Sequence, residues 1–212
     1  MELLYRIENM LTVKKILEAD EDFDVDSGSH SEKCIKFVQE YTKSGKILEV
    51  GCGKGKLFES VAVTDAIEPV SKRLEVDITK ERAKKYGVCL KYGFAECIPY
   101  DDNLFDTIIM LQVYEHVRSD LETLLEVSRV LKIGGHFIIA SPQSSVEPHF
   151  IPTHWRVICP SFFIEMMYRM GFILLKRQEL KAVGGEGMIF AFKKYRDFDV
   201  SVFKNYDDII NE

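Results

Sequence analysis

The segment from Glu49 to Gly55 has the composition of a ligand-binding turn. Three glycines alternate with other residues, and an acid precedes them. Glycine lets the backbone approach a ligand closely, and a helix that opens after such a turn would present free N–H groups. A dinucleotide-binding turn would carry its third glycine at position 56, where this chain has Lys56. The spacing therefore argues against NAD or FAD and favours another ligand, with a tight strand-to-helix turn that binds nothing as the alternative.

Glu68 is the second candidate for ligand binding, because it closes the next apolar run along the chain. A carboxylate at the end of a second parallel strand can accept hydrogen bonds from both hydroxyls of a ribose. The alternative is an exposed acid at a strand end. Asp65 stands earlier in the same run and should point to the opposite face, so we do not expect it in the site.

Few side chains could act as a general base. His116 follows the fourth predicted strand, with helix capping or a backbone hydrogen bond as its alternative role. His149 and His154 lie in residues 144–157, a stretch too long and polar for a plain turn. That stretch is either functional or a solvated surface loop. Tyr114 is expected to line the acceptor site.

Alternating elements must position these side chains. Short apolar runs predict buried parallel strands at residues 46–50, 62–68, 88–92, 105–111 and 136–141. Helical patterns lie between them at residues 71–86 and 119–132, and the second opens with the capping box Ser119-x-x-Glu122. Because strand and helix alternate, the sequence predicts an α/β fold with a doubly wound sheet.

The last third of the chain predicts a different connection. A helix should begin at Pro160 and end at Gly171. Two strands are expected at residues 172–180 and 188–193, with no helix-length segment between them. Strands joined in this way pair as antiparallel neighbours, so the sheet should end in a hairpin.

The chain of 212 residues predicts one domain, residues 31–212, preceded by a helical appendage at residues 1–30. The appendage carries an apolar stripe at helical spacing, followed by an acidic stretch that contains serine and glycine. A second helix should begin near Ser29, whose capping box ends at Glu32. We expect the first helix to act with residues 144–157 as a lid over the ligand, with packing on the back of the sheet or a dimer contact as the alternative.

Composition and charge exclude several classes of function. Hydrophobic residues make up 46% and the formal net charge is −6, so neither disorder nor a basic nucleic-acid groove is expected. No apolar run is long enough for a membrane helix, and the N-terminus does not read as a signal peptide. Five cysteines without CxxC spacing predict a reduced, cytoplasmic protein without a disulfide framework. No histidine pair has metal-ligand spacing, so no metal site is expected.

Several motifs in order carry a resemblance to a known family. They are the glycine-rich segment, Glu68 and four later motifs: Ala95-Glu96-Cys-Ile-Pro99-Tyr100, Phe105-Asp106, Glu115-His116 and Leu131-Lys-Ile-Gly134-Gly135. Over residues 46–142 the chain resembles the class I S-adenosylmethionine-dependent methyltransferases, in particular the small-molecule subgroup that includes ubiquinone and sterol methyltransferases. The resemblance implies S-adenosylmethionine as cofactor and a Rossmann-like, mostly parallel seven-stranded sheet of order 3-2-1-4-5-7-6 with helices on both faces.

The resemblance also implies a role for each matching residue. Glu49 would reach the amino group of the cofactor, whereas Glu68 and the adjoining Pro69 would hold its ribose. Ala95 and Glu96 would bind adenine. The remaining positions would line the amino-acid and ribose part of the cofactor or lie beneath its sulfonium: Gly51, Cys52, Gly53 and Gly55 for the first, Gln112 and Val113 for the second.

Phe94 departs from the family pattern. Many relatives carry Asp immediately before the Ala-Glu pair, where it binds the adenine amine. Either Glu96 takes over this contact here, or adenine is held by backbone and stacking contacts alone.

The expected reaction is methyl transfer to an O, N or C atom of a small molecule, with His116, His149 or His154 as candidate bases. The alternatives keep the fold and change the role: a protein or RNA acceptor, or a non-catalytic binding protein. The stretch Leu111-Gln-Val-Tyr114 lacks the Asn/Asp-Pro-Pro-Tyr/Phe tetrapeptide of base methyltransferases. The intact glycine segment argues against a non-catalytic protein, and both a monomer and a homodimer fit the sequence.

Overall fold

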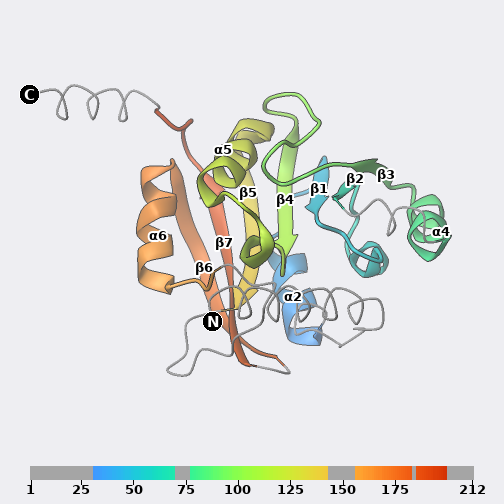
Figure 1. The fold of residues 1–212 in the computed structure, drawn as a ribbon, viewed down its shortest axis with the longest axis horizontal. Coiled ribbons are helices and arrows are strands. Elements are labelled where there is room, and N and C mark those ends of the chain that lie inside the picture. The colour runs from blue at the N-terminus through green and yellow to red at the C-terminus, as the bar shows by residue number, and fades with distance from the viewer. Residues whose placement is uncertain (1–30, 70–76, 143–155, 183–184, 200–212) are drawn as a thin grey trace, which may run out of the picture.

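Seven strands form a single sheet in the computed structural model, which describes residues 31–69, 77–142, 156–182 and 185–199 (Figure 1). The strands are β1 (Ile47–Val50), β2 (Asp65–Glu68), β3 (Cys89–Tyr92), β4 (Phe105–Leu111), β5 (Leu131–Pro142), β6 (Phe172–Ala182) and β7 (Gly185–Lys194). Their order is β3-β2-β1-β4-β5-β7-β6. This is the order that the resemblance implies, so the predicted fold class is confirmed.

Strand direction fixes which edge of the sheet can hold a ligand. β1 to β5 pair in parallel, whereas β7 pairs antiparallel with both β5 and β6. The predicted terminal hairpin is therefore present. The carboxyl ends of β1, β2, β4 and β5 meet at one edge, which is where open α/β sheets bind ligands.

Helices cover both faces of the sheet. On one face α5 (Asp120–Val130) and α6 (Pro160–Arg169) pack against a core rich in phenylalanine (Figure 1). On the other face lie α2 (Glu32–Tyr41), α4 (Asp77–Tyr86) and the four-residue 3-10 helix η2 (Lys56–Glu59). β1 and β4 supply side chains to both cores, as expected for central strands.

Helix ends follow local side chains, and two predicted ends were wrong. Ser119 caps α5 as predicted, because its Oγ accepts a hydrogen bond from the Glu122 amide at 3.3 Å. The cap of α2 is Ser31 rather than Ser29, which lies outside the described residues; the Ser31 Oγ accepts from the Cys34 amide at 3.3 Å. α5 ends at Val130 rather than at residue 132, because Leu131 already pairs with Phe105 as the first residue of β5.

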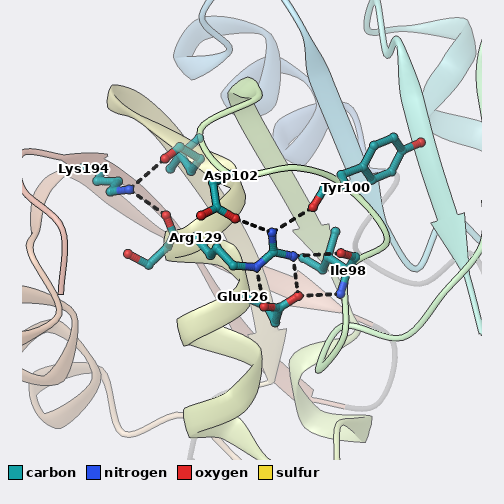
Figure 2. A network of polar contacts seen from close by, with 8 residues as sticks. Ile98, Tyr100, Asp102, Glu126, Arg129 and Lys194 are labelled. Carbon is teal, nitrogen blue, oxygen red and sulfur yellow. Dashed lines mark hydrogen bonds and ion pairs between the residues drawn. The ribbon is translucent and has the colours of Figure 1, made fainter. Parts of the chain in front are cut away.

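Arg129 on α5 holds the segment between β3 and β4 in place (Figure 2). Its guanidinium donates to the carbonyls of Ile98 and Tyr100 at 2.9 and 2.8 Å and to Asp102 Oδ1 at 2.7 Å. It also pairs with Glu126, which in turn accepts from the Ile98 amide at 2.7 Å. The segment that carries the expected adenine contacts is thus fixed to a helix by a network of charge-assisted hydrogen bonds.

Lys194, near the end of β7, ties the far side of the same helix. Its side chain is fully buried, and Nζ donates to the carbonyls of Ser128 and Leu131 at 2.6 and 2.8 Å (Figure 2). A cation at the C-terminal end of a helix satisfies carbonyls that have no partner within the helix. Asp197 pairs with the same Nζ at 2.6 Å, which balances the buried charge.

Candidate functional site

The glycine loop adopts a conformation that only glycine accepts without strain. Gly51, Gly53 and Gly55 have φ of 72°, 52° and 67°. A Cβ at Gly51 would clash with Val113, and one at Gly55 would lie 2.5 Å from Phe58. A Cβ at Gly53 would meet no atom within 4 Å. Two glycines are therefore needed for packing, whereas Gly53 faces the space that a ligand can fill.

The chain after this loop differs from the prediction. The sequence pattern predicted a helix opening directly after the glycines, but the chain forms the short 3-10 helix η2, preceded by the left-handed Gly55. A 3-10 helix of this length does not provide the N-terminal anion site of a long α-helix. The charged groups that this part of the chain offers a ligand are the acidic side chains Glu49 and Glu68.

Neighbouring elements hold the glycine loop rigidly. The Gly51 and Cys52 amides donate to the Ile67 carbonyl at 2.8 and 3.2 Å, which ties the loop to β2. From α4, Thr79 Oγ1 donates to the Gly53 carbonyl at 3.3 Å, and Arg82 donates to the Lys54 carbonyl at 3.0 Å. The loop conformation is thus fixed by the protein alone, as preorganised binding requires.

Glu68 ends β2 as predicted, and its carboxylate supports the glycine loop. The side chain ends β2 and is 2% exposed. Its Oε2 accepts a hydrogen bond from the Gly53 amide at 2.8 Å. The carboxylate therefore fixes the central glycine of the loop, and its expected contact with a ribose stays a prediction. Pro69, which follows it, is half-buried.

Glu49 is a buried acid with one oxygen that lacks a hydrogen-bond partner. It is 4% exposed, and its Oε2 has no hydrogen-bond partner. Burial, with the nearby charge of Glu68 acting in the same direction, raises the pKa of Glu49 to about 8. A buried acid beside a second carboxyl, with one oxygen unsatisfied, is suited to a positively charged hydrogen-bond donor.

The expected adenine side lies beyond β3. Ala95 is 6% exposed, and Glu96 is half-buried. Glu96 Oε1 accepts from the Arg118 amide at 2.7 Å, so this carboxylate links the segment to the start of α5. Phe94, which stands where relatives have Asp, is 43% exposed and packs edge-to-face on Tyr92 with ring centroids 5.4 Å apart. This side offers apolar and aromatic surface.

The end of β4 reaches the glycine loop. Gln112 has a left-handed φ of 54°, and its amide donates to the Ala140 carbonyl of β5 at 2.8 Å. Such a conformation is strained for a residue other than glycine and is common in functional sites. The next residue, Val113, is the one that a Cβ at Gly51 would strike. The structure therefore places Val113, which follows Gln112, against Gly51 of the glycine loop, and the contact of both residues with a cofactor stays a prediction.

Of the histidines expected to act as bases, one is described. His116 ends the 3-10 helix η3 (Tyr114–His116), is exposed, and its amide donates to the Val113 carbonyl at 2.9 Å. His149, His154 and the appendage at residues 1–30 lie outside the described residues. Their assignment, including the lid, stays a prediction.

Glu115 is a feature that sequence reasoning missed. It is fully buried, its Oε2 accepts from Ser141 Oγ at 3.1 Å, and its Oε1 has no hydrogen-bond partner. Burial raises the pKa of Glu115 to about 7, although its hydrogen bonds and Arg156 oppose the shift. Arg156 donates to the carbonyls of Tyr114 and Val117 at 2.8 and 2.5 Å and so fixes the same turn. The Glu-His pair was the available signal, but nothing in the sequence distinguished a buried Glu115 from an exposed one.

Two further expectations concern metal binding and membrane insertion. Within the described ranges, no group of three or more His, Cys, Asp or Glu side chains could hold a metal ion. The absence of a metal site nevertheless stays a prediction, since two histidines lie outside those ranges. None of the helices in the described part of the chain is both long and apolar enough to cross a membrane.

Comparison with known proteins shows that the part of the chain that carries the site is similar to methyltransferases. Residues 48–139 match the family described as "Methyltransferase domain". Demethylmenaquinone methyltransferase of Symbiobacterium thermophilum is 36% identical over 130 residues, which is 54% of this chain and 50% of that protein. Ubiquinone biosynthesis O-methyltransferase of Roseobacter denitrificans is 29% identical over 97 residues, 44% of this chain and 39% of that protein. The chain thus spans about half the length of the curated relatives that it matches.

Solved structures share the fold. A possible histamine N-methyltransferase from Thermotoga maritima superposes with a TM-score of 0.59 at 21% identity, over 76% of this chain and 86% of that one. The cyclase SpnF gives a TM-score of 0.65 at 18% identity, over 79% of this chain and 81% of that one. At these identities the likeness concerns the fold, which hosts more than one chemistry. Residues 48–139, together with the strand order and the glycine loop between Glu49 and Glu68, therefore make this part of the chain similar to a methyltransferase domain.

Proposed function

We propose that this protein binds S-adenosylmethionine and transfers its methyl group to an O, N or C atom of a small molecule. The observation that carries the proposal is the buried, unpartnered Glu49 Oε2, on a side chain that interacts with Glu68, whose carboxylate in turn accepts from the Gly53 amide at the edge of open space. S-adenosylmethionine has an α-ammonium group next to a nucleoside, and this oxygen suits an ammonium donor. The residues present therefore fit the cofactor.

Each part of the cofactor finds a matching surface. Glu49 would hold the ammonium group, and Glu68 the ribose hydroxyls, while Glu68 keeps its bond to the Gly53 amide. The apolar Ala95 and the exposed ring of Phe94 suit adenine, whose faces are aromatic. This favours stacking over an acidic contact as the way in which adenine is held.

The chain contributes orientation to the reaction. When bound, the cofactor supplies a methyl group on a positively charged sulfur, and the transfer is an in-line displacement. The rigid loop and the fixed turn after β4 would hold the reactants at attack distance, which is the main source of acceleration in such a transfer. His116, His149 and His154 remain candidates for taking a proton from an acceptor that has one to lose.

A small-molecule acceptor is the proposal that the relatives support. One of them is named as a ubiquinone biosynthesis O-methyltransferase and another as a demethylmenaquinone methyltransferase. The net charge of −6 does not suit a nucleic-acid acceptor. We also propose a cytoplasmic location and a reaction that needs no metal, because the cysteine and histidine spacing provides neither a disulfide framework nor a metal-ligand set.

Isothermal titration with S-adenosylmethionine, S-adenosylhomocysteine and NADH tests the proposal. We expect micromolar binding of the first two and none of NADH. Tritiated S-adenosylmethionine with a metabolite extract then tests transfer, since a labelled small molecule should form. Binding without any labelled product would favour the non-catalytic alternative, and failure of both cofactor forms to bind would overturn the proposed function.

A further inference from the structure

Glu49 lies in a position where charge is difficult to keep. Its neighbours in register across the sheet are Ala66 on β2 and Ile109 on β4, both fully buried and uncharged. With Oε2 unpartnered, an ionised Glu49 would be a buried charge with incomplete solvation, which is costly in a folded protein. An empty site therefore favours the protonated carboxyl.

The charged groups around Glu49 do not relieve this cost. Glu68, one strand away, contributes a second negative charge. On the loop Lys54 is exposed, and on η2 Glu59 pairs with Arg82 of α4 at 3.3 Å. The other titratable groups on these elements are Cys52, which is buried, and Lys56, which is half-buried. Burial and the charge of Glu68 raise the pKa of Glu49 to about 8 in the ligand-free protein.

We propose that Glu49 carries a proton while the site is empty and releases it to solvent when the ammonium group of the ligand binds, so that the site selects ligands that bring this cation. The inference rests on the proposed function and deepens it. The O–H bond of the carboxyl breaks, its electron pair stays on the oxygen, and the proton passes to buffer. The carboxylate then accepts an N–H hydrogen bond from the ammonium, which keeps its own protons.

Proton release is measured directly by titration calorimetry. S-adenosylhomocysteine is titrated at about pH 6.5, well below the raised pKa of Glu49, in phosphate and in imidazole buffer, whose ionisation enthalpies differ. We expect about one proton to be released per ligand bound, and an affinity that rises close to tenfold per unit between about pH 5.5 and 7. 5′-Methylthioadenosine, which has the nucleoside without the ammonium, should release none.

Variants separate Glu49 from other sources of protons. Glu49→Gln should abolish the release by S-adenosylhomocysteine and flatten the pH dependence of its affinity. Glu115→Gln is the matched control, because Glu115 is also buried with one unpartnered oxygen but lies at the ends of β4 and β5. It should leave the release by S-adenosylhomocysteine at about one proton.

The outcomes are distinct. Binding of S-adenosylhomocysteine by the wild-type protein without proton release overturns this inference and leaves the proposed function standing. Release that persists in Glu49→Gln, or that 5′-methylthioadenosine also causes, overturns it as well. Failure of both S-adenosylmethionine and S-adenosylhomocysteine to bind overturns the proposed function itself. The comparison of ligands on the wild-type protein requires no variant to fold.

Discussion

The sheet edge formed by the carboxyl ends of the parallel strands has two halves, and each half holds a buried glutamate in a different environment. At the ends of β1 and β2, Glu49 is buried with one oxygen unpartnered and faces a second carboxyl, that of Glu68. At the ends of β4 and β5, Glu115 is buried with one oxygen unpartnered, but it meets the Ser141 hydroxyl and the charge of Arg156. The pKa is raised to about 8 for Glu49 and about 7 for Glu115.

The difference lies in what each half lacks. The β1 and β2 half has an excess of negative charge, so a cation completes it. In the β4 and β5 half, the Ser141 hydroxyl and the charge of Arg156 partly offset the cost of burying Glu115, so a cation is less strongly favoured there. Burial alone therefore does not decide what a buried acid binds; the second charged neighbour does.

The largest effect is expected from Gly53→Val, which fills the space of the first half. The substitution should weaken S-adenosylhomocysteine binding by more than about 100-fold, because the side chain would occupy the ligand volume. Gly87→Val is the matched control: Gly87 also has a positive φ, 71°, and a Cβ there would meet no atom within 4 Å, but it follows α4. Calorimetry should find normal affinity in the control, and unchanged affinity in Gly53→Val would refute the assignment of the loop.

Removing the second carboxyl should have a smaller effect. Glu68→Ala loses charge-assisted contacts to the ribose and the bond to the Gly53 amide, with an expected loss of roughly 1.5–3 kcal/mol in binding free energy, about one to two decades in affinity. The 2′-deoxyribose analogue of S-adenosylhomocysteine should bind the wild-type protein more weakly than the parent. Equal affinities would mean that Glu68 only supports the loop.

The pH dependence of stability distinguishes the two buried acids. Below about pH 4.5 each carboxyl is protonated in both states, whereas above it only the folded protein keeps the proton, so stability falls as pH rises to the raised pKa. In the wild-type protein, Glu115 should lower the free energy of unfolding by roughly 1–3 kcal/mol as the pH rises to about 7, and Glu115→Gln should abolish this decrease. The decrease caused by Glu49 should continue to about pH 8, and Glu49→Gln should abolish that one. Urea unfolding of each variant and the wild-type protein from pH 4 to 9 measures the pH range over which each acid lowers stability. Identical pH ranges for Glu49 and Glu115 would contradict the difference between the two acids.

The smallest effect is expected away from both acids. Arg129→Lys keeps the charge but cannot make the planar set of bonds to Ile98, Tyr100 and Glu126. We expect unfolding free energy to fall by about 1 kcal/mol and affinity for S-adenosylhomocysteine to fall only a few-fold, through the adjoining adenine segment. A decrease in affinity as large as that of Glu68→Ala would mean that the segment contributes more than stacking.

Prediction from sequence succeeded where a pattern is local. β4 was predicted with its observed bounds, 105–111, because an unbroken apolar run in a central strand leaves little choice. The cap of α5 at Ser119 could likewise be predicted from the sequence. The C-terminal end of α5 could not be predicted, because Leu131 is apolar and suits either the helix or the strand that pairs with Phe105.

The site was predictable in part. Glu49, Glu68 and the glycines follow from a motif with fixed spacing, and in the structure Glu68 accepts from the Gly53 amide and interacts electrostatically with Glu49. The burial of Glu115 depends on Ser141 and Arg156, which are distant in sequence, so no local pattern could reveal it. The short helix after the loop was missed because the left-handed Gly55 turns the chain away from an α-helical start.

The place of β7 in the sheet has a consequence for how the protein is made. β7 is the last of the described strands in sequence but lies between β5 and β6, and its Lys194 reaches back to the carbonyls of Ser128 and Leu131. While the ribosome is still synthesising this strand, β5 and β6 have unpaired edges, and the end of α5 lacks its cation. Open strand edges are the usual template for aggregation. This half of the sheet therefore closes only after β7 has emerged, and a chain stalled before Gly185 should be the species that chaperones bind.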